Sequence, residues 1–505
     1  MVDKIKDSIL SILEYIVAIF IVLECRSVYL YSVNKEFYIM QILGIAMLCL
    51  FIANILFKKI KLKGILSDYK FILGLTIYNI IYIVAVRMKM TEIIRYLYIF
   101  EAMFLMLYIY YKENSKDTKL FLRKIVNVIV IISLISLFFY IFGTVLNIIP
   151  TTGTFKMTWG DFGKKEYSIN SYFDIHFNIQ RLSIWGLDIP RNTGIFTEGP
   201  MFALNILIAL ALQVFILKEK DWLKIFILVI TLFTTFSTAG ILGGILCFCC
   251  YLLCNKNIQE KIKKGINKKK TIIICITVVL LIVIVVGVLL RQKMKTASYS
   301  TRVDDYIASI FAWADNNIIF GNGIFNEQAI VNYMSTSRGV NTGVSNSIAT
   351  TLAGGGVFLS VIYIYAFCTM IENYKKYKDV GILCFFIVMI YLSITTIFQY
   401  TIMMISIMAL TIAIYHNDII KKNKNIILID FPKIKNWEFK ENLDKITNLR
   451  WEEVEGVSNW IRKNKISNFI RYIKYFLFPL DIFIKRTQYK NIVAWQQFCG
   501  LLYAF

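Results

Sequence analysis

Proline, histidine and charged residues are all scarce in this chain. Its 505 residues include five prolines and two histidines, and Asp, Glu, Lys and Arg together make up only 18 % of it. A soluble chain of this length would divide into two or three domains joined by polar linkers. That architecture is excluded for most of the chain. His176 and His416 lie far apart in the sequence, so a site of several histidines around one metal ion is excluded as well.

The cysteines do not supply a disulfide framework. Eight of the ten lie in apolar runs, and neither of the long polar segments between such runs contains one. Cys247, Cys249, Cys250 and Cys254 are close enough in sequence to suggest a metal cluster. Small apolar packing residues are the favoured interpretation of these four.

Apolar residues are abundant where charge is absent. They form 57 % of the chain, against about 45–50 % in soluble domains, and the mean hydropathy is +0.62. A helix needs about 20 apolar residues to cross a bilayer. Twelve segments qualify, near 8–25, 38–57, 70–87, 92–111, 125–149, 201–217, 222–236, 240–254, 271–290, 349–370, 380–396 and 400–416. The sequence therefore predicts an all-α polytopic membrane protein with about twelve transmembrane helices.

The basic residues predict the orientation. They concentrate in the short connections 58–70, 112–124, 218–224, 255–270 and 372–379, and they are sparse in 26–37 and 87–92. Basic connections stay in the cytoplasm, so both termini are expected there. Residues 222–254 are too long for one span, and Ser237 to Gly240 supply the turn of a helical hairpin. Two large extracytoplasmic loops follow from this topology, 150–200 and 291–348.

The chain divides into a transmembrane part, 1–416, and a cytoplasmic tail, 417–505. The net charge of +23 suggests nucleic-acid binding at first sight. Attraction of cytoplasmic basic residues to anionic membrane lipids explains it better, so no nucleic acid is expected. Residues 456–478 read as a basic amphipathic helix on the inner leaflet, with a docking site for a partner as the alternative.

The first loop ends in a pattern suited to anion binding. Pro200 fits the first turn of a helix, whose free N–H groups and positive dipole end favour anions. Arg191 lies just upstream and adds a cation that can form two hydrogen bonds to a phosphate. The two together predict a diphosphate-binding corner. An arginine extended towards the membrane interface beside an ordinary helix start is the alternative.

Apolar and polar residues alternate over 172–182, which predicts one extended strand. Its polar face would contain Asp174, His176, Asn178 and Gln180. Such a row can hydrogen-bond a sugar, and His176 can act as a base. The alternative is a strand that rests its apolar face on the membrane surface, with the polar row in water.

The second loop offers Arg302 as another phosphate ligand. Asp304 and Asp305 are adjacent, so on a helix their side chains would diverge by about 100°, which makes a shared metal ion a weak interpretation. Neither loop holds an Asp-X-Asp pattern, and we expect a mechanism with no metal and no other cofactor. Gly321-Asn322-Gly323 predicts a turn, and Ser345-Asn346-Ser347 can cap the tenth span.

These features together resemble the bacterial O-antigen polymerase and ligase superfamily, the Wzy-type enzymes of surface polysaccharide assembly. The resemblance lies in Arg191…Gly-Ile-Phe-Thr-Glu198-Gly-Pro200, in Phe236-Ser-Thr-Ala-Gly240, and in Arg302 followed by Gly321-Asn-Gly323. It covers roughly residues 1–416. Ligase-type members often have a histidine before the asparagine at the tenth span and Ser-Arg in the hairpin. This chain has Ser345-Asn346 and Ser237-Thr238, which favours the polymerase.

The resemblance implies a metal-independent, inverting glycosyltransferase at the outer face of a bacterial cytoplasmic membrane. Its donor and acceptor would be oligosaccharide repeat units on polyprenyl diphosphate, and other assembly proteins could dock on the tail. Arg191 and Arg302 would hold the diphosphate, and Glu198 or His176 would be the base. Besides the ligase, two alternatives remain. One is a twelve-helix transporter or flippase of lipid-linked sugars, and the other is a non-catalytic assembly subunit.

Overall fold

A computed structural model describes most of the chain. The described residues are 2–33, 38–57, 59–60, 68–114, 118–158, 166–184, 187–219, 221–254, 297–338, 342–421, 424–429, 451–455 and 489–494. They divide into two compact units, Met1–Ala413 and Ile414–Phe505. Each is considered by itself.

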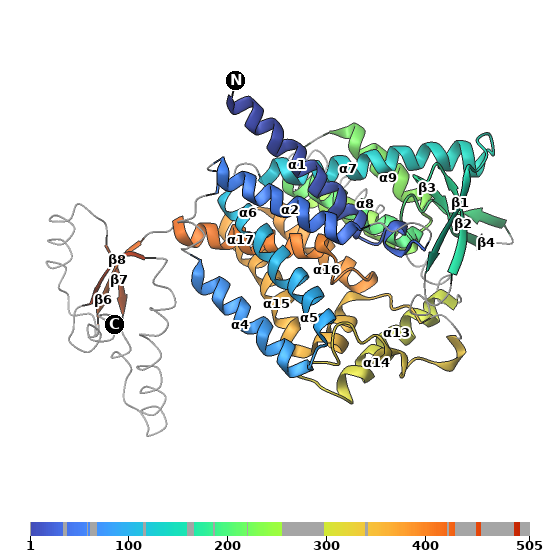
Figure 1. The fold of residues 1–505 in the computed structure, drawn as a ribbon. Helices are drawn as coiled ribbons and strands as arrows, with labels where there is room; N and C mark the ends of the chain where they lie inside the picture. Colours follow the sequence, from blue (N-terminus) through green and yellow to red (C-terminus); the bar gives the residue numbers. More distant parts are fainter. Residues whose placement is uncertain are drawn as a thin grey trace, which may run out of the picture. The chain divides into compact units, whose positions relative to one another are not determined.

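Helices make up most of the first unit (Figure 1). Those of eight residues or more are α1 (Val2–Glu24), α2 (Ile39–Leu56), α4 (Tyr69–Val86), α5 (Met90–Leu97), α6 (Phe104–Glu113), α7 (Thr118–Phe139), α8 (Gly199–Ala211), α9 (Trp222–Thr234), α10 (Thr238–Cys254), α13 (Ala297–Ala314), α15 (Ser347–Tyr377), α16 (Val380–Thr395) and α17 (Ile402–Lys421). Short helical pieces complete them: η1 (Val28–Tyr31), η2 (Tyr98–Met103), η3 (Tyr140–Val145), η5 (Leu212–Leu217), α14 (Gln328–Val331) and η6 (Thr336–Arg338).

Six helices among the described residues are long and apolar enough to cross a membrane. They are Ile39–Leu56, Tyr69–Val86, Met90–Glu113, Thr118–Val145, Gly199–Leu217 and Ser347–Tyr377. Four shorter apolar helices are Trp222–Thr234, Thr238–Leu252, Val380–Thr395 and Ile402–His416. The chain is thus a mostly helical protein of the membrane type. The predicted span 271–290 lies outside the described residues, and the count of twelve stays a prediction.

The expected hairpin within 222–254 is confirmed. Helix α9 ends at Thr234 and α10 begins at Thr238. Phe236 in the turn has a φ of 46°, a left-handed conformation that bulky residues rarely adopt. The turn is closed by Gly240, whose N–H donates to the Ser237 hydroxyl over 3.2 Å.

The polar connections collect at two ends of the helices. At one end lysines and arginines meet carboxylates, in the pairs Lys112–Asp68, Arg123–Glu219 and Lys218–Asp379. At the other end the connections bond to one another: Asn192 N–H donates to Thr234 O over 3.0 Å, and the Ser347 hydroxyl donates to Thr396 O over 2.7 Å. Helices that cross a membrane in alternating directions place their polar connections at two opposite ends in this way. The basic end is the one expected in the cytoplasm.

Short strands lie outside the apolar helices. In the first loop, β1 (Gly153–Thr158), β2 (Glu166–Tyr172) and β3 (His176–Asn178) form an antiparallel sheet, and β4 (Arg181–Ile184) pairs with β5 (Leu187–Pro190). Figure 1 shows the sheet beside one end of α7. The single strand expected over 172–182 is wrong. Phe173 and Asp174 have φ values of 53° and 55°, so the chain turns there and continues in two different hairpins.

The second loop joins a break in α15. The cap expected there is confirmed, because the Asn346 side chain accepts a hydrogen bond from Ala349 N–H over 2.9 Å. Gly356, with φ 62° and ψ −167°, interrupts the helix. Across the break, Asn322 N–H donates to Ala353 O over 2.9 Å and Val357 N–H donates to Ile318 O over 3.0 Å. The glycine-rich turn is therefore built into the helix.

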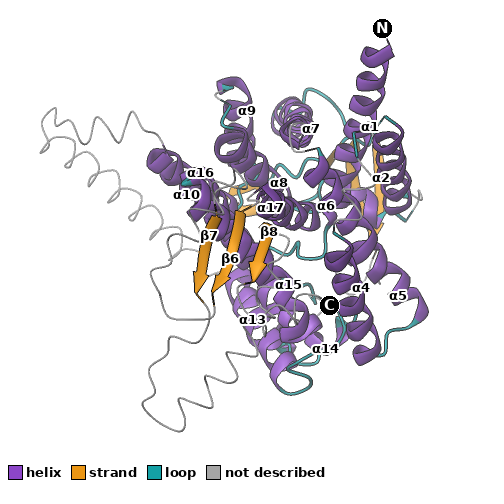
Figure 2. Ribbon diagram, turned by 90° about the vertical axis from the view of Figure 1, so that its left-hand side faces the viewer, coloured by secondary structure: helices purple, strands orange, loops and turns teal. Residues whose placement is uncertain are grey.

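The second unit contains a small parallel sheet. Strands β6 (Lys424–Ile429), β7 (Trp451–Glu455) and β8 (Tyr489–Ala494) lie in the order β7-β6-β8, and both outer strands run parallel to β6 (Figure 2). The strands add β structure that the all-α expectation did not include. The amphipathic helix expected over 456–478 lies outside the described residues.

Replacing Gly356 tests the break. A Cβ there would lie 2.3 Å from Ile319 O, and its backbone conformation is accessible almost only to glycine, at a cost of about 1–3 kcal/mol to other residues. We expect Gly356→Ala to lower the melting temperature of the purified protein in detergent. Gly74→Ala is the matched control, because nothing lies within 4 Å of a Cβ at that position. Equal melting temperatures for the two variants would contradict the structure.

Candidate functional site

Arg191 lies where the first loop meets the hairpin of α9 and α10. Its Nε donates to Thr235 O over 3.0 Å, and its Nη1 donates to the Gln180 side-chain oxygen over 3.2 Å. The backbone is held as well, since Arg191 N–H donates to Gln180 O over 2.9 Å. The guanidinium is thus fixed on two sides, while its Nη2 donates to no other described residue.

The start of α8 explains the sequence Glu198-Gly-Pro200. Pro200 falls in the first turn, as expected. A Cβ at Gly199 would lie 2.9 Å from Nη2 of Arg191 and 2.8 Å from Thr235 O. Only glycine lets the guanidinium lie this close to the first turn of a helix. Arg191 and the helix start therefore form one corner, as the sequence predicts.

Arg302 reaches the same region from the second loop. It lies on α13, and its Nη1 donates to Thr395 O at the end of α16 over 3.0 Å. The end of α16 contacts the hairpin, because Tyr391 donates a hydrogen bond to Ala239 O over 2.6 Å. Nε and Nη2 of Arg302 have no hydrogen-bond partner among the described residues. Both arginines thus retain free donors.

Glu198 carries the negative charge of this cluster. Burial raises the pKa of Glu198 above its ordinary value of 4.5, while Arg191, Arg302, a hydrogen bond with Gln180 and Arg26 oppose the shift. The pKa of Arg191 is lowered, chiefly by burial and also by Arg302, against the influence of Glu198. Two arginines more than a hundred residues apart in sequence therefore act on one carboxylate.

Arg26 is a third arginine of the cluster that the sequence did not single out. It follows α1 in a left-handed conformation, with φ 66°, and its Nη1 donates to the Tyr31 hydroxyl over 2.9 Å. Its carbonyl accepts from Thr197 N–H over 3.2 Å, next to Glu198. The available signal was a basic residue in an outer connection that otherwise holds few. We name Arg26, Arg191, Arg302, Glu198 and Gln180 the arginine cluster.

The expected sugar-binding row is not brought together. Asp174 lies in the turn after β2 and accepts from the Ser171 hydroxyl over 2.9 Å. Asn178 pairs with Asn170 in the sheet. Gln180 alone of the row contacts the cluster, where its side-chain oxygen also accepts from Gly199 N–H over 3.3 Å. The four polar side chains do not share one face because the turn at Phe173 and Asp174 interrupts the extended strand.

His176 belongs to the interior rather than to the polar face. Its exposed fraction is 1 %, and its ring packs against Phe139 and Tyr172 with the Ser136 hydroxyl 3.4 Å from Nδ1. Burial lowers the pKa of His176 to about 4. A weakly basic ring that is closed to solvent cannot reach a sugar hydroxyl, so the interpretation of His176 as a base is withdrawn.

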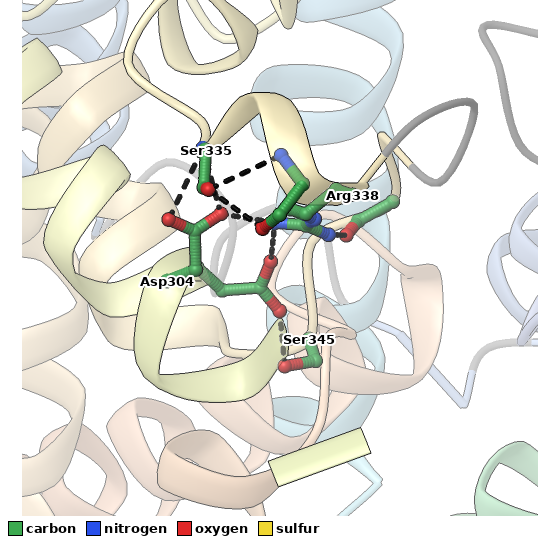
Figure 3. A network of polar contacts seen from close by, with 7 residues as sticks. Asp304, Ser335, Arg338 and Ser345 are labelled. Carbon is green, nitrogen blue, oxygen red and sulfur yellow. Dashed lines mark hydrogen bonds and ion pairs between the residues drawn. The ribbon is translucent and has the colours of Figure 1, made fainter. Parts of the chain in front are cut away.

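Asp304 and Asp305 share one partner, Arg338, in a network of polar contacts (Figure 3). Nη1 of Arg338 lies 3.2 Å from an Asp304 oxygen and also contacts Asp305. The Ser345 hydroxyl donates to Asp305, and Ser335 N–H donates to Asp304 over 3.2 Å. Burial raises the pKa of Asp305, against hydrogen bonds from Ser345 and the charge of Arg338. The network fastens the end of the second loop to α13, the helix that carries Arg302.

A polar hollow of about 430 Å³ lies beside the second loop, between residues 86–92 and 322–326. Lys89, Glu92 and Asn326 line it. Glu327, which follows this lining in the sequence, interacts electrostatically with Arg26 of the arginine cluster. Among the described residues, no group of three or more His, Cys, Asp or Glu side chains could hold a metal ion.

No protein-family model matches the chain, and no curated protein matches it significantly.

Arg338 provides a test of the network. Its side chain is 5 % exposed and that of Asp305 is 0 % exposed. Removing one partner of such a buried pair costs about 3–5 kcal/mol, so Arg338→Met should lower the melting temperature and open residues 297–338 to limited proteolysis. Arg181→Met is the control. It breaks a pair with Asp188 that is 51 % and 61 % exposed, worth about 0–1 kcal/mol. A similar loss in both variants would count against the network.

Proposed function

We propose that this protein is a lipid-linked oligosaccharide polymerase. It joins repeat units carried on polyprenyl diphosphate into a surface polysaccharide, at the outer face of the bacterial cytoplasmic membrane, without a metal ion. The observation that carries the proposal is the arginine cluster. Arg26, Arg191 and Arg302 come from three separate segments at the less basic end of the helices, and all three act on Glu198.

The cluster suits a diphosphate leaving group. Guanidinium groups form paired hydrogen bonds with phosphate oxygens, and Arg191 and Arg302 keep donors that no other described residue uses. The start of α8 adds the positive end of a helix dipole. Fixed positive charge placed where negative charge develops lowers the barrier without reorganisation during the reaction.

The transfer itself needs little more. The hydroxyl oxygen of the acceptor sugar attacks the anomeric carbon of the donor, the bond from that carbon to the phosphate oxygen breaks, and the diphosphate leaves with the electron pair. Glu198 accepts the hydroxyl proton. Its raised pKa makes it a stronger base than an ordinary glutamate. The polar hollow beside Glu327 offers hydrogen bonds for the acceptor sugar.

Arginine variants test the diphosphate role. Arg191→Ala and Arg302→Ala should each lower the turnover of purified protein on lipid-linked repeat units by about 10²–10³-fold, which is the usual cost of losing one such donor. Both variants should still accumulate in the membrane. Arg181→Ala, an exposed arginine on the neighbouring hairpin, should retain activity. Normal long polymer from either cluster variant would refute the assignment.

The same assay separates the alternatives. A transporter or flippase moves its substrate between leaflets and would not lengthen lipid-linked oligosaccharide in detergent, where no leaflets exist. A non-catalytic assembly subunit would tolerate loss of each arginine singly. Chain growth by the wild-type protein alone, lost in the cluster variants, would leave the polymerase as the function.

The pH dependence tests Glu198 as the base. Only its ionised form can take the proton, so the rate should fall as the pH drops through the pKa of Glu198. Because burial raises that pKa above 4.5, the fall should begin at a higher pH than an ordinary glutamate would give. Initial rates in buffers of constant ionic strength measure it. Glu198→Gln should remove this limb and leave a low, flat rate. An unchanged profile in that variant would assign the base elsewhere.

A further inference from the structure

An apolar groove of about 690 Å³ runs along the helices next to the arginine cluster. It is lined by residues of η3, β5, α9 and α10, chiefly Ile141, Val145, Ile189, Phe233, Phe236 and Ile241. Ile141, Val145 and Phe233 are 40 %, 49 % and 56 % exposed. The groove therefore offers an open apolar surface on helices of the membrane type.

The groove adjoins the contact between Arg191 and Thr235. Pro190 lines it and precedes that arginine in the chain, while Thr234 and Phe236 line it on either side of Thr235. The carbonyl of Thr235 is the group that accepts the hydrogen bond from Arg191 Nε. An apolar chain lying in the groove would thus have its polar end at the guanidinium.

Two features distinguish the groove from an ordinary lipid-facing surface of the helices. A polar hairpin closes one side of it, since β5 pairs with β4 and the Tyr140 hydroxyl donates to Pro190 O over 2.9 Å. Phe236 turns towards it from a left-handed conformation, with φ 46°. Backbone strain at a bulky residue persists where the surroundings enforce it, and such residues gather at ligand sites.

We propose that this groove binds the first isoprene units of the lipid that carries the diphosphate. The inference rests on the proposed function and adds the place where the lipid is recognised. Charge and apolar surface meet between Arg191 and the groove, in the order in which a prenyl diphosphate presents them. Phospholipid acyl chains are the competing occupant that the experiment distinguishes.

Photolabelling tests the groove without relying on turnover. A prenyl diphosphate with a diazirine on its first isoprene units is irradiated with the full-length protein in nanodiscs, and the labelled peptides are identified by mass spectrometry. We expect labels within 140–145 and 233–241, displaced by undecaprenyl diphosphate and not by phosphatidylglycerol. Labels elsewhere, or equal displacement by the phospholipid, would overturn the proposal.

A matched pair of variants fills the groove. Val145→Trp adds bulk inside it and should reduce this labelling at least about tenfold, since each buried methylene is worth about fourfold in affinity. Leu134→Trp adds the same bulk at a site on α7 that is 47 % exposed, close to the 49 % of Val145, and does not line the groove. It should label like the wild type. Full labelling in Val145→Trp would refute the groove.

Kinetics keep this proposal separate from the polymerase itself. With a donor on a geranyl chain, which supplies the first two isoprene units, Val145→Trp should raise KM at least about tenfold over the wild type while kcat stays near the wild-type value. If Val145→Trp polymerises with an unchanged KM, the groove is refuted and the polymerase is kept. A protein that labels as expected and never polymerises would refute the polymerase and keep the lipid site.

Discussion

The close approach of Arg191 to the first turn of α8 is the contact on which the site depends. A cation at the amino end of a helix faces the positive end of its dipole, and here Arg26 and Arg302 add charge of the same sign. Glu198 and the carbonyl of Thr235 offset part of that repulsion. The repulsion that they do not offset is electrostatic energy that an anion would release on binding. The same positions therefore favour the binding of an anion.

This constraint also explains why the backbone and side-chain conformations around the site are restricted. Gly199 must lack a side chain, Gln180 must bridge the guanidinium to the helix start, and the turn between α9 and α10 must present its carbonyl. The β4–β5 hairpin and the break in α15 hold the two loops on which Arg191 and Arg302 depend. Rigid placement of this kind is what pre-organised electrostatic catalysis requires.

Sequence reasoning found the parts of the site that have local causes. Pro200 predicts a helix start, Asn346 predicts a cap, and the glycines at 321 and 323 predict a turn, because each depends on backbone rules within a few residues. The alternation of spans places Arg191 and Arg302 at the same end of the helices. It does not predict which helices are neighbours in the membrane plane, so the proximity of Arg26 to Glu198 could come only from the three-dimensional arrangement.

The errors have local causes as well. A period of two over 172–182 predicts one strand only if every residue stays extended, and Phe173 and Asp174 do not. One left-handed pair sends His176 into the interior and separates Asp174 from Gln180. The adjacent Asp304 and Asp305 were not expected to share a partner, yet both contact Nη1 of Arg338. Arg338 is long enough to reach both carboxylates from outside the helix.

The break at Gly356 limits how the second loop can move. Residues 318–323 exchange backbone hydrogen bonds with both halves of α15, and Tyr82 of α4 donates to Gly354 O over 2.9 Å. A segment joined in this way to two helices cannot swing aside as a hinged lid. Any molecule bound beside this loop must therefore enter and leave without displacing residues 318–323.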